Sequence, residues 1–240
     1  MAPVRRLAAV VRKPHFSARL RRHPAGLGKR VYLMTENAKP SRVEIVKRER
    51  LLDAFFKVDR VTVSHERFSG GMSEPRPFLV MDRGDAVAAL LYDPERRKVI
   101  TVKQFRIPTL GKSQGGGWLI EAVAGMIATH PDGSFAETPL ETLIREVREE
   151  TGYHIAQAKH LCTFFSSPGG NTERTFLFYA EVRDADRLSK GCGLEAEGED
   201  IAIVEFDLAE FFAKLAAGEF EDAKLLMAGY WLMARHARAG

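Results

Sequence analysis

The segment from Thr138 to Gly152, "TPLETLIREVREETG", constrains the fold most, because it specifies a helix with both ends defined. Thr138 and Glu141 form a Thr-x-x-Glu capping box, and Pro139 suits the first helical turn. Gly152 supplies a left-handed stop. The apolar residues between these ends recur at helical spacing and predict one buried stripe: Leu140, Leu143, Ile144 and Val147.

Three glutamates lie along the edge of that stripe. At about 100° per residue, Glu146 and Glu150 are one turn apart, and Glu149 flanks them on the side away from the stripe. Like charges at this spacing destabilise a helix by about a few tenths of a kcal/mol, and the helix dipole disfavours anions near the carboxyl end. A solvated charged face is the ordinary explanation of such a run. A divalent cation would reverse both penalties, and rigidly held oxygen ligands suit Mg²⁺, or Mn²⁺, when substrate phosphates complete the shell.

Outside this helix the chain reads mostly as strands, with two further helices near its carboxyl end. Period-two alternation predicts strands from residue 43 to residue 105, and "WLIEAVAGM" predicts one more. Two strands around a Gly-rich loop and a late strand, "EDIAIVEFD", follow the helix. We therefore expect an α+β fold, an α/β/α sandwich around a mixed sheet, with an arm over residues 1–40, an antiparallel strand subdomain over 41–84 and the main domain over 85–238.

Charge is distributed unevenly along the chain. Residues 1–35 contain nine Lys and Arg and no Asp or Glu, so the remaining 205 residues carry 27 basic and 32 acidic side chains. Three explanations of the basic arm stay open: a disordered segment with weak affinity for polyanions, an organellar targeting peptide within residues 1–33, or a true start at Met34.

The cysteine count and the length of the apolar runs indicate the compartment in which the protein works. Cys162 and Cys192 are the only cysteines, which excludes a framework of several disulfides and indicates a reducing compartment, so we expect a cytoplasmic protein. No run approaches the ~18 apolar residues that a membrane span requires. We therefore expect no membrane partner.

The helix segment also carries a motif. Glu137, seven further residues and then "REVREETGY" resemble the core of the Nudix box, Glu-x7-Arg-Glu-U-x-Glu-Glu-x-Gly-U with U apolar. Gly125 in "EAVAGM" is the counterpart of the opening glycine of the box, although it lies six residues too far upstream of Glu137. The resemblance implies a Nudix fold and hydrolysis of a nucleoside diphosphate linked to another moiety, with metal ions neutralising the pyrophosphate and orienting the attacking water.

Similarity beyond the box runs from about Val43 to about His236 and looks like the ADP-ribose pyrophosphatase subgroup. The matching pieces include "DRGDAVAALLYD", "QFRIPT", "GWLIEAVAGM", "SSPGGNTER" and "EGEDI". The resemblance implies Mg²⁺-dependent hydrolysis of ADP-ribose to AMP and ribose 5-phosphate. The alternative is a pyrophosphatase for another nucleotide sugar, such as GDP-mannose, and a remote alternative is a nucleic-acid-associated protein that acts through the basic arm. By analogy we expect a homodimer joined through residues 43–82, a small-molecule substrate and no stable nucleic-acid partner.

The same resemblance implies roles for individual residues. It places the metal ligands at Glu146, Glu149, Glu150 and the carbonyl of Ala124. It implies catalytic roles for Glu173, Glu149 and Arg145, the last by pairing with the carboxylates. The implied substrate contacts are Phe55, Arg76, Arg106 and Met126.

Taken without the resemblance, three of these residues have ordinary explanations. An arginine that follows a strand, such as Arg106, is usually a surface residue, and a Phe-Phe pair such as Phe55 and Phe56 is more often core. Glu173 follows a glycine-rich segment that reads as a mobile hairpin tip. An arginine expected four residues before the acidic residue of "DRG" is replaced by Phe78, which leaves Arg76 as the nearest basic residue.

Overall fold

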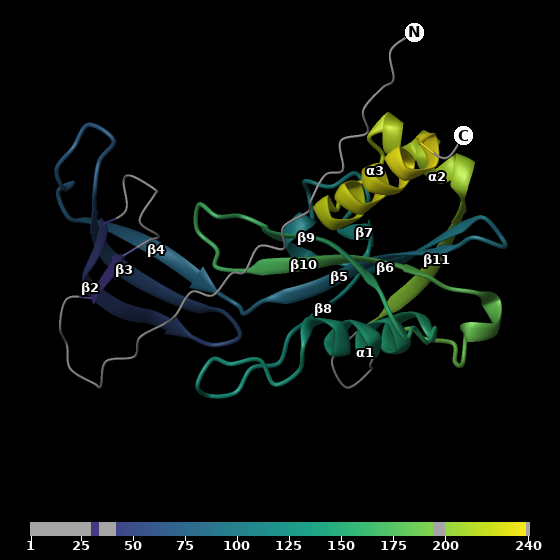
Figure 1. Ribbon diagram of the computed structural model, residues 1–240, viewed down its shortest axis with the longest axis horizontal. Helices are drawn as coiled ribbons and strands as arrows, with labels where there is room; N and C mark the ends of the chain where they lie inside the picture. The colour runs from purple at the N-terminus through teal and green to yellow at the C-terminus, as the bar shows by residue number, and fades with distance from the viewer. Residues whose placement is uncertain (1–29, 34–41, 194–199, 239–240) are drawn as a thin grey trace, which may run out of the picture.

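The computed structural model describes residues 30–33, 42–193 and 200–238. The chain forms two sheets, a smaller one at its amino-terminal end and a larger one sandwiched between helices (Figure 1). No helix in the described ranges is long and apolar enough to cross a membrane. Both cysteines are free.

The smaller sheet has four antiparallel strands in the order of the sequence. They are β1 (Arg30–Leu33), β2 (Arg42–Asp53), β3 (Lys57–His65) and β4 (Arg76–Asp82). The expected strand subdomain is therefore present, but it begins earlier than we expected. Residues 30–33, which we assigned to the basic arm, pair with β2 along its first residues.

The larger sheet is mixed. Its strands are β5 (Ala86–Asp93), β6 (Lys98–Phe105), β7 (Trp118–Glu121), β8 (Val123–Met126), β9 (Lys159–Phe165), β10 (Arg174–Glu181) and β11 (Ile201–Asp207). The order is β11-β6-β5-β10-β9, with β7 paired to β6 and β8 paired to β5. Only the β5–β10 pair among these is parallel.

Helices cover both faces of the larger sheet, as Figure 1 shows. One face packs against α1 (Pro139–Thr151), and the other against α2 (Leu208–Ala217) and α3 (Ala223–Ala237). Two short 3₁₀ turns, Ile107–Thr109 and Asp184–Asp186, lie in the connections. Every residue of β5 is buried, with alternate side chains entering the two core layers. The α/β/α sandwich predicted from the sequence is thus confirmed.

A seam runs through the middle of this sheet. β5 and β6 pair only over three positions beside their hairpin and then separate. The chain from β7 to β8 fills the gap, changing its pairing from β6 to β5 at Ala122. The buried Ala122 N–H donates instead to the Asp222 carboxylate, 3.1 Å away at the start of α3. We predicted one continuous strand here, and two form because this long-range bond takes the place of a ladder hydrogen bond.

Candidate active site at the seam

The predicted helix is α1, and both of its ends have the predicted structure. The Thr138 hydroxyl accepts from the Glu141 N–H at 3.2 Å, and the Glu141 carboxylate accepts from the Thr138 N–H at 2.7 Å. Gly152 ends the helix in the left-handed region, with φ of 74°. These caps fix where α1 begins and ends, and so which of its residues face the sheet.

Glu146 points inward and lies against β8. Its exposed fraction is only 8%. A Cβ atom added at Gly125 would lie 1.9 Å from the Glu146 Cδ and 2.1 Å from its Oε1. Gly125 is therefore a glycine because the carboxylate of Glu146 occupies the space that any side chain would need. Gly125, the predicted counterpart of the opening glycine of the box, thus touches the helix despite the extra length of chain between them.

Glu150 lies one turn further along α1 and is buried to 3% exposure. Its Oε2 accepts a long hydrogen bond, 3.4 Å, from the Ala124 N–H. The N–H and C=O groups of one strand residue point to the same side of the strand. The Ala124 carbonyl is therefore turned toward the Glu150 side of β8, away from the β5 ladder.

Arg145 joins the carboxylates on the solvent side. Its guanidinium lies 2.9 Å from Glu146, 2.9 Å from Glu149 and 3.4 Å from Glu137. Burial alone would lower the pKa of Arg145, but the charges of Glu146 and Glu149 outweigh burial and leave that pKa raised. The like charges that seemed unbalanced along the helix are therefore partly offset within the chain.

Arg106 approaches the same cluster from the end of β6. Its guanidinium binds the buried Glu121 of β7 at 2.7 Å. Burial would lower the pKa of Arg106, but the hydrogen bonds and charge of Glu121, together with the charges of Glu150 and Asp222, leave it raised. Arg106 thus stays cationic beside the cluster, with a fixed orientation.

The donor set fits a hard divalent cation. Glu146 and Glu150 supply carboxylate oxygens, Glu149 lies beside them, and the Ala124 carbonyl faces the same side. No three His, Cys, Asp or Glu side chains in the described ranges converge on one point as a finished ion site. Carboxylate and carbonyl oxygens of this kind are the ligands that hard divalent cations prefer.

Glu173 lies at the neighbouring edge of the sheet. Ala86 at the start of β5 pairs with Met126 on one side and with Thr175 on the other. Glu173, two residues before Thr175, is buried to 9% exposure. Its Oε2 lies 2.9 Å from the Arg83 Nε, as an ion pair that is not aligned as a hydrogen bond. Glu173 is therefore held by a cation and is not the solvent-facing residue of a free hairpin tip.

The loop before Glu173 is fastened to the end of β4. The Met81 N–H donates to the Gly170 carbonyl at 2.8 Å, the Thr172 N–H donates to the Met81 carbonyl at 3.0 Å, and the Thr172 hydroxyl donates to Asp82 at 2.8 Å. We read this loop as mobile from its glycines, but these bonds to another strand, which composition does not reveal, restrain its second half.

The predicted substrate contacts divide into two groups. Met126 is half-buried, and its Cε would lie 3.6 Å from a Cβ atom at Gly84, so it borders the same edge as Glu173. Phe55 is 72% exposed in the turn between β2 and β3, not in a strand, and its ring packs 4.9 Å from that of Phe56. Phe56 lies 6.0 Å from the Arg83 guanidinium, so this turn approaches the edge.

Arg76 lies far from the candidate site within the same chain. It begins β4, whose other end, Asp82, joins the edge. Six strand residues at about 3.3 Å each separate these ends by about 20 Å. Phe78, at the position where the resemblance implies an arginine, is exposed.

Two residues of the site were missed by sequence reasoning. Glu121 is a charged residue inside the apolar run "WLIEAVAGM", and a buried charge requires a partner, so it could have been paired with Arg106. Arg83 adjoins Gly84 in "MDRGD", but nothing local indicates that it reaches Glu173. The matching piece "EGEDI", residues 197–201, lies partly outside the described residues.

Comparison with known proteins agrees with this arrangement. A family model described as "NUDIX domain" matches residues 82–228. GDP-mannose pyrophosphatase of Cronobacter sakazakii is 34% identical over 185 residues, which cover 77% of this chain and 92% of that protein. ADP-ribose pyrophosphatase of Escherichia coli strain K12 is 34% identical over 194 residues, which cover 81% of this chain and 89% of that protein.

A solved structure described as "Crystal structure of ADP compounds hydrolase" has the same fold. Its TM-score is 0.60 at 18% sequence identity, and the match covers 82% of this chain and 95% of that one. The family match includes α1, the seam strands and the edge that carries Glu173. This chain belongs to the NUDIX domain family.

Proposed function

We propose that the protein is a metal-dependent pyrophosphatase that hydrolyses ADP-ribose to AMP and ribose 5-phosphate. The observation that carries this proposal is the pair of buried carboxylates, Glu146 and Glu150, held on one side of β8 by Gly125 and Ala124. Burying two carboxylates this close is costly unless cations meet them. The names of the similar proteins, which include ADP-ribose pyrophosphatases, support the same reaction.

Each residue has a proposed part in the reaction. Glu146, Glu150 and the Ala124 carbonyl hold Mg²⁺, and Glu149 completes the set. When bound, the ion neutralises the diphosphate and lowers the pKa of a coordinated water. Arg145 orients the carboxylates, because its guanidinium bridges Glu146 and Glu149.

Arg106 is proposed to bind the diphosphate. Glu121 fixes its orientation through the 2.7 Å ion pair, and its raised pKa keeps it charged. A planar guanidinium with donors left over after one carboxylate contact suits a phosphate oxygen. Met126 borders the substrate space, and Phe55 is proposed to stack on the base, since its ring is exposed and lies in the turn that approaches Arg83.

GDP-mannose is the second candidate substrate, because two observations favour it. The GDP-mannose pyrophosphatase and ADP-ribose pyrophosphatase relatives are equally similar, at 34% identity. Phe78 also stands where the ADP-ribose subgroup is expected to have a substrate arginine.

A substrate panel tests the proposed function. The purified protein is assayed with ADP-ribose, GDP-mannose, UDP-glucose, NADH and capped RNA, with Mg²⁺ or Mn²⁺ and then with EDTA. We expect the highest kcat/KM for ADP-ribose, release of AMP, and no turnover with EDTA. Preference for GDP-mannose would move the assignment to the second candidate, and metal-independent turnover would overturn both.

We further propose that Glu173 is the general base that deprotonates the attacking water. It lies at the edge bordered by Met126, and Arg83 holds its carboxylate in place. Glu173→Gln should lower kcat by roughly 10²- to 10⁴-fold, with little change in KM or in metal affinity. A collapse of metal affinity would make Glu173 a ligand instead. Unchanged kinetics would direct the search for the base to the other acidic residues.

We also propose that the active form is a cytoplasmic homodimer joined through the four-stranded sheet. That sheet leaves large apolar side chains exposed: Val46, Leu51, Leu52, Phe78 and Leu79. Leu79→Asp should give monomers in sedimentation or light-scattering measurements. Phe68→Asp is the matched control, since Phe68 is 93% exposed in the β3–β4 connection, outside the strands. A Leu79→Asp protein that remains dimeric would place the interface elsewhere.

A further inference from the structure

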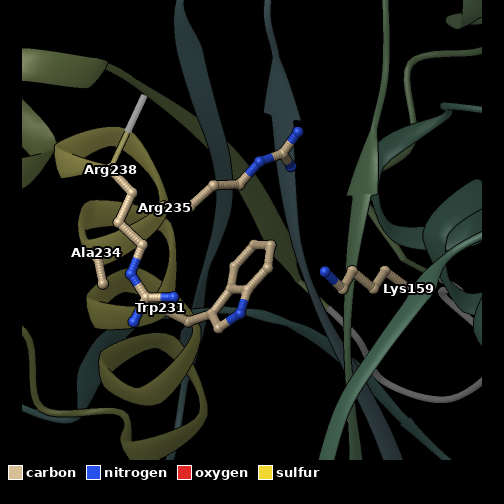
Figure 2. Close-up of a pocket in the computed structure, with 5 residues that line it drawn as sticks. All are labelled: Lys159, Trp231, Ala234, Arg235 and Arg238. Atoms are coloured by element: carbon tan, nitrogen blue, oxygen red, sulfur yellow. The ribbon is translucent and has the colours of Figure 1, made fainter. Parts of the chain in front are cut away.

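A basic pocket lies between the start of β9 and the last turns of α3. Its volume is about 390 Å³, and Figure 2 shows the residues that line it: Lys159, Trp231, Ala234, Arg235 and Arg238. α3 and α1 cover opposite faces of the sheet, so this pocket is separate from the carboxylate cluster of α1.

Several donor groups of the pocket have no acceptor among the described residues. The Lys159 ammonium lies 5.0 Å from the centre of the Trp231 ring, and Figure 2 shows it directed toward that ring. Over the described ranges, no carboxylate lies within ion-pair distance of Lys159 or Arg238, and no acceptor binds the Trp231 indole N–H. Arg235 differs, because Glu181 pairs with it at 3.1 Å and the Tyr179 ring lies 5.1 Å from it.

An ordinary explanation accounts for part of this cluster. Arginines in the last turn of a helix offset its dipole, which is sufficient for Arg235 and Arg238. It does not account for Lys159, which comes from β9, or for the hollow between the two elements. Contact with an aromatic face stabilises an exposed cation by only about 0.5–1 kcal/mol. Glu181 offsets the charge of Arg235, but Lys159 and Arg238 still repel each other across the pocket, and a dianion placed between them would remove that repulsion.

We infer that this pocket binds the phosphate group of a small phosphomonoester. Its volume lies in the range of about 300–1,000 Å³ of small-molecule pockets. A lysine supplies a point charge, an arginine supplies paired donors, and the indole N–H supplies one more, a combination that suits a phosphate dianion. Both products of the proposed reaction carry this group, so the pocket would sense product. That last step depends on the proposed function, whereas the binding itself does not.

Tryptophan fluorescence tests the binding directly. Trp118 and Trp231 are the only tryptophans, so Trp118→Phe leaves Trp231 as the single reporter. The variant is titrated with inorganic phosphate, ribose 5-phosphate and AMP at constant ionic strength and without divalent cations, which keeps hydrolysis out of the measurement. We expect a saturable change in emission with a Kd of about 1 mM or lower, and none with ribose or added NaCl. An emission that does not saturate with any of the three ligands overturns the inference.

Charge reversal then locates the site. In the Trp118→Phe background, Lys159→Glu and Arg238→Glu should each weaken phosphate binding at least about tenfold. Arg67→Glu, on an exposed residue of the β3–β4 connection, makes the same change of charge and should leave binding unchanged. Lys159→Gln gives a milder test if a glutamate variant melts early. Equal binding in the Lys159, Arg238 and Arg67 variants overturns the site, and binding to phosphatidic acid vesicles alone overturns the small-molecule assignment.

Discussion

The central strand of the larger sheet, β5, has all of its residues buried, whereas β4 of the smaller sheet exposes Phe78 and Leu79. The difference follows from what covers each sheet. Helices lie on both faces of the larger sheet, whereas none of the helices in the described residues packs on the smaller one (Figure 1). The larger sheet thus buries its apolar side chains within the chain itself. The smaller sheet leaves large apolar side chains exposed, as a surface that binds another protein does. The proposed chemistry lies in the first region and the proposed assembly in the second.

The strongest test of this division removes a proposed metal ligand from the larger region. Glu150→Gln keeps the shape of the side chain but loses its charge. We expect kcat to fall about 10³-fold or more, because metal stabilisation contributes several kcal/mol to the transition state. The melting temperature should hardly change. Arg148→Gln, an exposed residue of the same helix, is the control. Near wild-type turnover in saturating Mg²⁺ would remove Glu150 from the ligand set.

A second substitution moves Glu146, a proposed ligand, without changing its chemistry. Gly125→Ala would place a methyl group where the Glu146 carboxylate lies, so Glu146 must move. Displacement of a reacting group by about 1 Å costs on the order of 10²-fold in rate, and overpacking costs about 1–3 kcal/mol of stability. Gly169→Ala is the control, because nothing lies within 4 Å of a Cβ there. Full activity of Gly125→Ala, measured with the same assay, would contradict the packing described for Glu146.

A third substitution tests stability within the larger region. Asp222 caps α3 and also accepts the Ala122 N–H. Asp222→Ala loses a cap worth about 1 kcal/mol and leaves a buried donor unpaired at about 1–3 kcal/mol. We expect the free energy of unfolding to fall by about 2–4 kcal/mol in a denaturant titration. Asp207→Ala removes the N-cap of α2, where the side chain makes no cap bond, and should cost less than about 1 kcal/mol.

The smallest expected effect belongs to the four-stranded sheet. Asp59 is buried and pairs with Arg50 and Arg48. The hydrogen bond from Arg50 lowers the pKa of Asp59 by more than burial raises it, and Arg48 adds to the effect. Because the folded-state pKa is lowered, the stabilisation is present above the unfolded pKa of about 3.9 and is lost as the pH falls through the folded value.

Asp59→Asn should remove that part of the pH dependence. Melting temperatures of the variant and the wild type, measured from pH 7 to pH 2, should converge as the pH falls below about 4. An equal gap at every pH would show that the carboxylate charge contributes nothing. A matched change at Asp53, which pairs with Arg50 but is exposed, should leave the acid dependence nearly unchanged.

Sequence reasoning succeeded where the information is local. The caps, the buried stripe and the carboxylates of α1 follow from residues within one helix, and the helix has those ends. It failed where one residue depends on another far along the chain. The break at Ala122 requires Asp222, and the restraint on Glu173 requires Arg83. Phe55 was misplaced for a related reason, since a Phe-Phe pair has the composition of a strand and only the register of β2 with β3 puts it in a turn.

The contact between Ala122 and Asp222 also makes one amide informative about a distant helix. Most amides of β6 are held by neighbouring strands, so their exchange with deuterium requires the sheet to open. The Ala122 amide is held by a side chain from the start of α3. It will exchange whenever α3 separates from the sheet, even while the strands stay paired. The deuterium uptake of this one position therefore measures how often the carboxyl-terminal helix undocks.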